Sequence, residues 1–218
     1  KDFFSDTNSL GLNVTLPFKK NAAKLKGIIS DEAFFISAVN TIKKDRSKLM
    51  LESTDGQGFL NDLFKLGIDL NGKHILVLGA GAAVNSILFK IIKAKPNKIS
   101  IINRTHRKIE LISKKFSKLH NINKYNNSPV DIIINGSSAG LTGEFKPYFD
   151  LNLVENSIFY DLNYSLEQTP FCSWASEKSK NVYDGKGMLI EQAALSFKEW
   201  FGIKPDTNKI KKDLNDLK

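Results

Sequence analysis

The sequence predicts an α/β protein with a Rossmann-like, doubly wound parallel sheet and a smaller α/β substrate domain, with a cleft between them. First, the apolar run at 74–79 is typical of a strand buried on both faces. Second, strand and helix patterns alternate after this run, which indicates βαβ units. Third, a hairpin pattern precedes the alternation and an amphipathic helix follows it, so both ends of the chain are expected to form the second domain.

The composition is that of a globular protein. The chain has 218 residues, enough for one large or two small domains, and its 41% hydrophobic and 25% charged residues exclude a disordered or fibrous chain. No segment approaches the roughly 18 apolar residues of a membrane span, and nothing at residues 1–10 resembles an export signal. The single cysteine, Cys172, excludes an internal disulfide and fits a reducing cytosol, so we expect a cytoplasmic protein without a membrane partner.

The net charge of +9 is open to more than one interpretation. A basic balance is compatible with nucleic acid, an anionic membrane surface or anionic small ligands. The basic residues are 29 Lys and only 3 Arg, which favours a lysine-coated, solvated surface. The basic stretches also lack interleaved aromatic residues, so nucleic-acid binding is the weaker alternative. Two of the three arginines, Arg104 and Arg107, stand close together, and we expect a specific role for them.

The first 55 residues are expected to form the substrate domain. Residues 12–16 have the pattern of a strand, closed by Pro17, and 31–38 that of a helix. The segments 39–43 and 48–53 flank a polar turn, which predicts a hairpin.

Residues 56–185 are expected to form the nucleotide-binding domain. Helical spacing runs from Phe59 to Leu66, before the buried strand. Further strands are predicted at 98–103, 130–135 and 157–162, and further helices at 82–94 and 106–119. Helices at 187–201 and 206–217 would return the chain, as segment 186–218, to the substrate domain.

A glycine-containing turn directly follows the buried strand and opens a helix. It comprises Gly79, Ala80, Gly81, Ala82 and Ala83. Small residues let the backbone approach a pyrophosphate, whose charge the free N–H groups and the helix dipole favour. Val84 replaces the third glycine of G-x-G-x-x-G, and a mere tight strand–helix turn is the alternative. The position of the turn inside a βαβ unit favours a dinucleotide site.

The end of the next strand indicates which dinucleotide binds. NAD-binding domains place Asp or Glu there to bind the ribose 2′-hydroxyl. Here Asn103 is followed by three cations, Arg104, Arg107 and Lys108, and no acid occurs before Glu110. A guanidinium suits a 2′-phosphate, whereas cations at a helix start are otherwise unfavourable. The sequence therefore predicts NADP.

A lysine and an aspartate are candidates for proton transfer. Lys19 follows a strand end that Pro17 stiffens, and Asp55 lies where the hairpin meets the next helix. A Lys–Asp pair across a domain cleft would be an oriented proton donor. Spacing alone favours the alternative, a surface lysine beside an N-cap aspartate.

Eight blocks of sequence occur in a fixed order over nearly the whole chain. They are FFSDTNSLGLNVTLPFK (3–19), AVNT (38–41), TDGQGF (54–59), LGAGAA (78–83), NRT (103–105), NGSSAGL (135–141), YDLNYSLEQTPF (160–171) and DGKGMLIEQAALSFKEWFG (184–202). In these blocks the chain resembles the shikimate dehydrogenases of aromatic amino-acid biosynthesis, on the pathway to chorismate. Eight ordered blocks are more specific than any single motif.

The resemblance implies a reversible, NADPH-dependent reduction of 3-dehydroshikimate to shikimate. It implies that Lys19 is the catalytic acid/base and that Asp55 is its partner and a ligand of a ring hydroxyl. Further substrate ligands would be Thr15, Asn40, Tyr164 and Gln192. From the residues alone, a surface aromatic is an alternative for Tyr164.

The resemblance also assigns residues to the cofactor. Gly79 to Ala83 would bind the pyrophosphate. The 2′-phosphate and adenine side would be bound by Asn103, Arg104, Thr105 and Lys108. The nicotinamide pocket would contain Ser137, Ser138, Leu162, Gly185 and Met188, and Asp31 matches a further cofactor position. Core packing alone would also explain Met188. The three histidines, His74, His106 and His120, lack metal-ligand spacing, so no metal is predicted.

The chain departs from the family pattern in three places. Family members begin with a strand and a Ser-x-Ser segment that binds the substrate carboxylate; the chain starts after this point, so we expect a truncated or fragmentary chain. The usual arginine after NRT is Lys108, which Arg107 would supplement. Residues 126–129 replace a helix. The alternatives left open are an NAD-using quinate/shikimate dehydrogenase and a non-catalytic nucleotide-binding remnant. A monomer and a homodimer are both compatible with the sequence.

Overall fold

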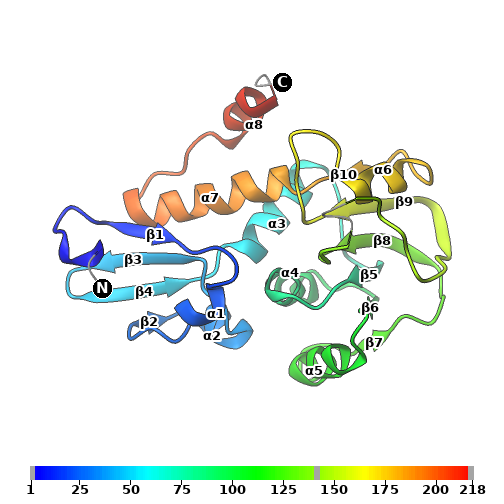
Figure 1. Cartoon of the computed structure of the whole chain (residues 1–218), viewed down its shortest axis with the longest axis horizontal. Coiled ribbons are helices and arrows are strands. Elements are labelled where there is room, and N and C mark those ends of the chain that lie inside the picture. Colours follow the sequence, from blue (N-terminus) through cyan, green and yellow to red (C-terminus); the bar gives the residue numbers. More distant parts are fainter. Residues whose placement is uncertain (1–2, 140–142, 216–218) are drawn as a thin grey trace.

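The structure is a computed structural model that describes residues 3–139 and 143–215. Two sheets lie side by side, joined by helices (Figure 1). The smaller sheet has the order β1-β3-β4-β2, and the larger has the order β10-β9-β8-β5-β6-β7. The described chain therefore confirms the predicted fold class, a Rossmann-like parallel sheet accompanied by a smaller α/β unit.

The elements of the smaller sheet come from the N-terminal region. Its strands are β1 (Gly11–Asn13), β2 (Ile28–Ile29), β3 (Thr41–Asp45) and β4 (Lys48–Glu52), and its helices are α1 (Lys19–Ala22) and α2 (Asp31–Ile36). A 3-10 helix, Phe3–Ser5, precedes them. The strands β3 and β4 form the predicted hairpin, in which Asp45 pairs with Lys48. Ala33, Val39, Ile42 and Leu51 form the core of this unit.

All neighbouring strands of the larger sheet are parallel. Its strands are β5 (His74–Leu78), β6 (Lys98–Ile102), β7 (Ile122–Lys124), β8 (Val130–Asn135), β9 (Leu153–Asp161) and β10 (Val182–Tyr183). Every residue of β5 is buried, as its apolar run predicts. Ile75 and Val77 face one hydrophobic core, and Leu76 and Leu78 face another, because successive side chains of a strand point to opposite faces.

Helices cover both faces of this sheet. The helices from Asp55 onward are α3 (Asp55–Lys65), α4 (Ala82–Lys93), α5 (His106–Phe116), α6 (Pro170–Ser176), α7 (Lys186–Phe201) and α8 (Thr207–Asn215), the last of which packs on α7. The helices α3, α4 and α5 contribute to one core, whereas α6 packs against the opposite face (Figure 1). This two-sided covering is what the predicted doubly wound arrangement requires.

Helix α7 connects the two sheets. It packs along α3, where Gly58 allows a close approach: a Cβ at this position would lie 2.6 Å from the backbone nitrogen of Gln192. At its other end, the indole of Trp200 donates a hydrogen bond of 3.0 Å to the carbonyl of Ile42 in β3. The relative position of the two sheets therefore depends on the α3–α7 contact.

Several predicted boundaries differ from the structure. The strand predicted at 12–16 ends at Asn13, because the chain then turns through a hydrogen bond of 2.9 Å from the Phe18 N–H to the Thr15 carbonyl. Lys19 consequently begins α1 instead of following a strand. The helix predicted at 106–119 ends at Phe116, and the strand predicted at 157–162 already begins at Leu153. The end predicted for the last helix, residue 217, lies outside the described residues.

Six short elements of the described chain were not predicted. They are the 3-10 helix, α1, β2, β7, α6 and β10, each of two to seven residues. Such segments contain too few residues to show a hydrophobic period, and their pairing comes from longer neighbours. In the part of the chain that the structure describes, no helix is long and apolar enough to cross a bilayer.

The packing of α7 on α3 generates a first prediction. The buried Asp62 carboxylate accepts a hydrogen bond of 2.7 Å from the Tyr160 hydroxyl, and a Cβ on Gly187 would lie 1.8 Å from its Oδ1. We therefore expect Gly187→Ala to lower the free energy of unfolding by about 1–3 kcal/mol, a typical cost of overpacking. Urea unfolding of Gly187→Ala, Asp62→Ala and the double variant tests whether contact with Asp62 causes the loss of stability. The two losses should be less than additive, and simple additivity would show that Asp62 does not cause the clash.

Candidate active site

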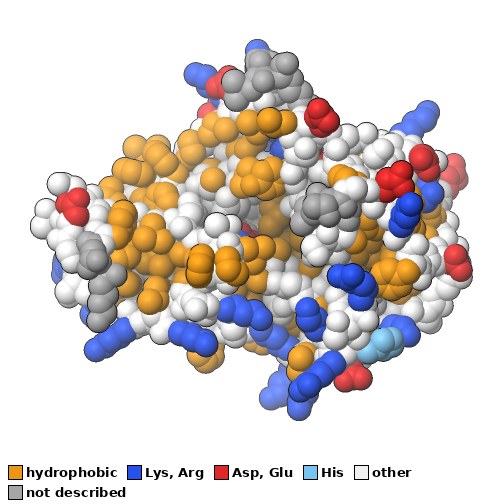
Figure 2. Space-filling view, viewed as in Figure 1, with side chains coloured by type: hydrophobic (Ala, Val, Ile, Leu, Met, Phe, Trp, Pro, Cys, Tyr) orange, Lys and Arg blue, Asp and Glu red, His pale blue; other side chains and the backbone are white. Residues whose placement is uncertain are grey.

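A cavity of about 1080 Å³ lies between the two sheets, at the carboxyl ends of β5, β6, β8 and β9. Ligands of open α/β sheets bind outside this edge. The opposite wall comes from the segment after β1, from the start of α3 and from α7. On this face of the molecule, Lys and Arg side chains gather along the lower edge and apolar side chains over β1 and α7 (Figure 2).

Lys19 and Asp55 meet at the wall formed by the segment after β1 and the start of α3. The Lys19 Nζ lies 2.6 Å from Asp55 Oδ2, and their side chains are only 15% and 6% exposed. Asp55 is the first residue of α3, where the helix dipole favours a carboxylate. The backbone carbonyl of Lys19 accepts a hydrogen bond of 3.0 Å from the Val39 N–H, which ties α1 to the segment before β3 that carries Asn40. The sequence separates the two side chains by 36 positions, and the fold brings them together.

Asn40 orients the Asp55 carboxylate through a hydrogen bond. Its side chain is buried, and Nδ2 lies 2.9 Å from Asp55 Oδ1 and 3.1 Å from Gln192 Oε1. Its Oδ1 accepts a hydrogen bond of 2.8 Å from the Thr54 backbone. Each oxygen of Asp55 thus has its own donor, Asn40 or Lys19. The carboxylate is held in one orientation, with the ammonium on the cavity side.

The glycine turn forms a second wall. Gly79 has a φ of +103°, and a Cβ there would lie 2.7 Å from the Gly136 carbonyl oxygen, so the turn requires glycine. Gly81 precedes α4 with no side-chain cap, and a Cβ there would meet no atom within 4 Å. Its missing side chain therefore leaves open space at the helix N-terminus, which is the geometry that a phosphate needs.

The rim beside this turn is basic. Asn103, Arg104, Thr105 and Lys108 line it, and the Asn103 side chain donates a hydrogen bond of 3.0 Å to the Thr105 carbonyl. Burial raises the pKa of Tyr148 on the facing loop, and the nearby positive charge of Arg104 opposes this shift. Among the described residues that line the cavity, Asp55 is the only acid. The rim thus has the charge expected for a phosphate ligand and lacks a carboxylate for a free 2′-hydroxyl.

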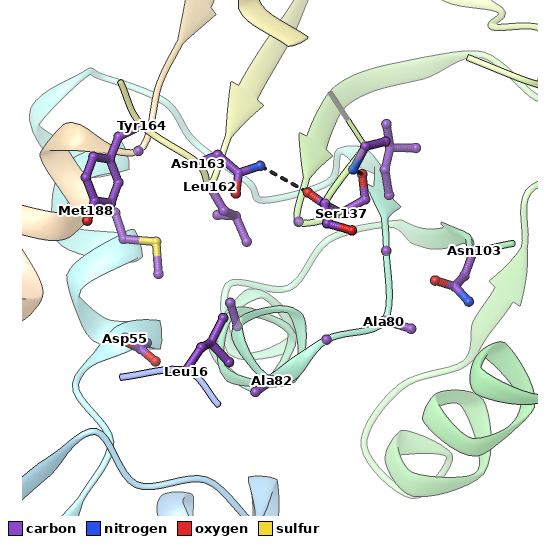
Figure 3. A pocket seen from close by; sticks show the side chains of 18 of the residues that line it. Leu16, Asp55, Ala80, Ala82, Asn103, Ser137, Leu162, Asn163, Tyr164 and Met188 are labelled. Carbon is purple, nitrogen blue, oxygen red and sulfur yellow. Dashed lines mark hydrogen bonds between the residues drawn. The ribbon is translucent and has the colours of Figure 1, made fainter. Parts of the chain in front are cut away.

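Most of the remaining predicted residues also line the cavity. They are Thr15, Tyr164 and Gln192, predicted for the substrate, and Ser137, Ser138, Leu162, Gly185 and Met188, predicted for the nicotinamide. Figure 3 shows Tyr164 beside Met188 and Leu162 between Met188 and Ser137. Met188 also belongs to the hydrophobic core, and Tyr164 is 55% exposed, so both interpretations of these residues agree with their positions. Asp31 and Arg107 do not line the cavity: both are exposed, in the first turns of α2 and α5, so neither is assigned to the cofactor.

Sequence reasoning missed several lining residues. Asn163 lies between two predicted residues and donates a hydrogen bond of 3.0 Å to the Ser137 carbonyl (Figure 3). Its place in the YDLNY block was a usable signal. Gly136 follows Asn135 in the NGSS block, whereas Asn13 and Tyr148 carry no pattern that points to a site. In the described chain, no group of three or more His, Cys, Asp or Glu side chains lies where it would hold a metal ion.

The fold and the cavity together define a class: a Rossmann-like α/β protein whose larger sheet faces a smaller sheet across a shared cavity. Residues 62–142 match the family model described as "Shikimate / quinate 5-dehydrogenase", and residues 185–214 match "Shikimate 5'-dehydrogenase C-terminal domain". A "Shikimate dehydrogenase (NADP(+))" of Vesicomyosocius okutanii is 44% identical over 218 residues, covering 97% of this chain and 81% of the relative.

Solved structures agree with this relationship. The shikimate dehydrogenase of Aquifex aeolicus has a TM-score of 0.86 at 31% identity, over 99% of this chain and 80% of that one. The Thermus thermophilus shikimate 5-dehydrogenase, in complex with NADP(H) and shikimate, has a TM-score of 0.86 at 28% identity, over 97% and 80%. The chain therefore belongs to the shikimate dehydrogenase family.

The open space at Gly81 generates a prediction about the cavity. The backbone there suits alanine, so Gly81→Ala should cost at most about 1 kcal/mol of stability, from a poorer helix N-cap. The added methyl group projects into the space that we assign to a pyrophosphate. Titration with NADPH, followed by nicotinamide fluorescence, should show affinity weakened about tenfold or more, which corresponds to about 1.4 kcal/mol. Unchanged affinity in a folded variant would place the dinucleotide elsewhere.

Proposed function

We propose that this chain catalyses the reversible, NADPH-dependent reduction of 3-dehydroshikimate to shikimate. The observation that carries the proposal is the Lys19–Asp55 pair, which lies in the same cavity as a glycine turn and a basic rim. Family membership adds the substrate class, because the relatives with this sequence pattern are named shikimate dehydrogenase (NADP(+)).

The residues of the cavity fit NADP(H). The turn from Gly79 to Ala83 leaves room at the N-terminus of α4 for the pyrophosphate. Arg104 and Lys108 would bind the 2′-phosphate, with Asn103 and Thr105 beside the adenosine. The nicotinamide would lie toward Leu162 and Met188, near Ser137. When bound, the cofactor supplies the hydride that reduces the substrate carbonyl carbon.

Lys19 supplies the proton in this mechanism. Reduction of a ketone places negative charge on its oxygen, and a positioned ammonium donates a proton there or stabilises the charge. Asp55 accepts a hydrogen bond from Lys19 and keeps the ammonium at the cavity wall. In the oxidative direction Lys19 takes the proton back from the substrate hydroxyl, so one side chain is both acid and base.

The polar groups around this pair suit a ring that carries several hydroxyls. Asn40 and Gln192 hydrogen-bond to one another, and Thr15 and Tyr164 line the cavity nearby. Asp55 has two oxygens, so it can accept a bond from a ring hydroxyl in addition to its bond from Lys19. We assign these five residues to the substrate.

Other features of the protein stay predictions. We propose that the substrate domain comprises residues 1–55 together with 186–218, and that 56–185 bind the nucleotide. We also propose a cytoplasmic enzyme, monomeric or homodimeric, that acts without nucleic acid. These proposals rest on the sequence patterns and on the composition.

The basic rim predicts a preference for NADPH over NADH. Arg104→Ala should raise KM for NADPH roughly ten- to hundred-fold, the effect of about 1.5–3 kcal/mol for a charge-assisted contact, and leave KM for NADH nearly unchanged. Arg46→Ala is a matched control, because Arg46 lies in the β3–β4 turn and its loss changes the net charge equally. An equal rise in KM for NADPH and NADH would refute the assignment of Arg104 to the 2′-phosphate.

The mechanism predicts that Lys19 acts in the chemical step. Lys19→Ala should lower kcat by at least about 10²–10⁴-fold, a typical contribution of general acid catalysis, while KM for 3-dehydroshikimate changes little. Lys20→Ala is the control, because this neighbouring lysine is exposed and outside the cavity. The assay follows nicotinamide absorbance with substrate in both directions.

A second variant tests whether the pair acts as a unit. Asp55→Asn should lower both kcat and substrate affinity, and its effect should be non-additive with Lys19→Ala. A Lys19→Ala enzyme with near-normal kcat and only a raised KM would show that Lys19 merely binds the substrate. The proton would then come from another group or from water.

A further inference from the structure

We propose that Asp161 is a positioning residue that sets the nicotinamide wall of the cavity without touching either ligand. This inference rests on the proposed function. Asp161 is the last residue of β9 and is 1% exposed. Neither the sequence patterns nor the resemblance assigns it a role, although it immediately precedes Leu162, which lines the cavity.

The Asp161 carboxylate accepts four hydrogen bonds from three segments of the chain. Oδ1 accepts from the Asn135 side chain at 2.9 Å and from the backbone and the side chain of Asn163, each at 3.0 Å. Oδ2 accepts from the Thr169 hydroxyl at 2.7 Å. One carboxylate therefore connects the end of β8, the loop after β9 and the start of α6.

The bonds to Oδ1 lead directly to the cavity wall. Asn135 Oδ1 accepts from the Ser137 backbone at 3.1 Å and from its hydroxyl at 2.7 Å. The Asn163 side chain also donates to the Ser137 carbonyl at 3.0 Å (Figure 3). The N–H and hydroxyl of Ser137 are thus linked to Asp161 through Asn135, and its carbonyl is linked through Asn163. The Leu162 N–H donates to the Asn135 carbonyl at 2.8 Å, which connects the two loops once more.

Hydrogen bonds compensate for the burial of the Asp161 carboxyl group. Burial raises the pKa of Asp161, and the hydrogen bonds from Thr169, Asn163 and Asn135 counteract the shift. In the described chain, no ion pair within 4 Å neutralises Asp161, so its donors are neutral side chains and backbone. A buried charge is costly unless it is well hydrogen-bonded. Both oxygens of the buried carboxyl group have donors here: Oδ1 accepts from the asparagines of both loops, and Oδ2 accepts from Thr169.

The bond to Oδ2 serves a different purpose. Thr169 is the N-cap of α6, where its hydroxyl also accepts a hydrogen bond of 3.2 Å from the Cys172 backbone. This oxygen supports the start of α6, whereas the bonds to Oδ1 lead to Ser137. The two oxygens therefore allow a positioning role to be separated from a purely structural one.

The experiment compares two ligands that share only the adenosine half. NADPH reaches the nicotinamide wall, whereas adenosine 2′,5′-bisphosphate ends before it. Asp161→Ala should weaken NADPH binding and lower kcat, each by about tenfold to a hundredfold, because small displacements of a reacting group are costly. The affinity for adenosine 2′,5′-bisphosphate should stay within about twofold, since coupling to the distant adenosine site is not expected. Asp161→Asn should restore most of both values, because its amide can turn toward Thr169 and leave the oxygen to the asparagines.

Thr169→Val is the matched control. It removes the Oδ2 bond and the α6 cap, so it should lower stability while kcat and NADPH affinity stay near normal. If Asp161→Ala does not fold, Asn163→Ala carries the same expectation, because this side chain contacts both Asp161 and Ser137.

Two results would overturn the proposal. One is an Asp161→Ala protein that loses stability as Thr169→Val does, yet keeps normal kcat and NADPH affinity. The other is an equal loss of affinity for both ligands, which would indicate a general collapse of this sheet edge. A wild-type protein that binds NADPH but does not turn over shikimate would refute the proposed function alone. The comparison of the two ligands would still test Asp161.

Discussion

The buried amide of Asn40 is the constraint on which the site depends. Its side chain contacts the N-terminus of α3 through Thr54 and Asp55, and it contacts α7 through Gln192. Thr41 and Ser196 extend this network with a hydroxyl pair 2.6 Å apart. A buried polar group that loses its partner costs about 1–3 kcal/mol, so the β3 strand, α3 and α7 have one favourable arrangement. That arrangement places Asp55, and with it Lys19, at the cavity wall.

The parallel sheet determines the other wall of the cavity. The strands β5, β6, β8 and β9 all end at the same edge, so a turn after any of them faces the same space. This edge collects the glycine turn, the basic rim and the loops around Ser137 and Leu162. Each of these segments is far from the others in sequence. Their meeting follows from strand direction and needs no contact among the segments themselves.

The sequence predicted the parts of the fold that carry a long hydrophobic period. The buried strand at His74–Leu78, the β3–β4 hairpin and the long helix α7 belong to this group. Short segments such as β2 and β10 were missed, because two residues show no period. The strand predicted through residue 16 also ended early, since nothing in the local pattern marks the turn from Thr15 to Phe18.

The site was predictable as a set of residues but not as a set of contacts. Nearly all residues that the family blocks indicated line one cavity, whereas the Lys19–Asp55 contact required the fold to close 36 positions of chain. The hydrogen bonds to the Asp161 carboxylate could not be predicted from the sequence for a different reason. Its donors are a strand-end residue, Asn135, a loop residue, Asn163, and a helix cap, Thr169, and only the approach of three segments gives them a common acceptor.

A structure of the chain with shikimate and NADP⁺ bound would test the central claim most directly. The account predicts that the hydroxyl to be oxidised lies about 2.6–3.2 Å from the Lys19 Nζ, the reach of a general acid or base. Its carbon would face the nicotinamide between Leu162 and Met188. A complex in which that hydroxyl points to another side chain, with Lys19 still paired to Asp55 and out of reach, would contradict the account.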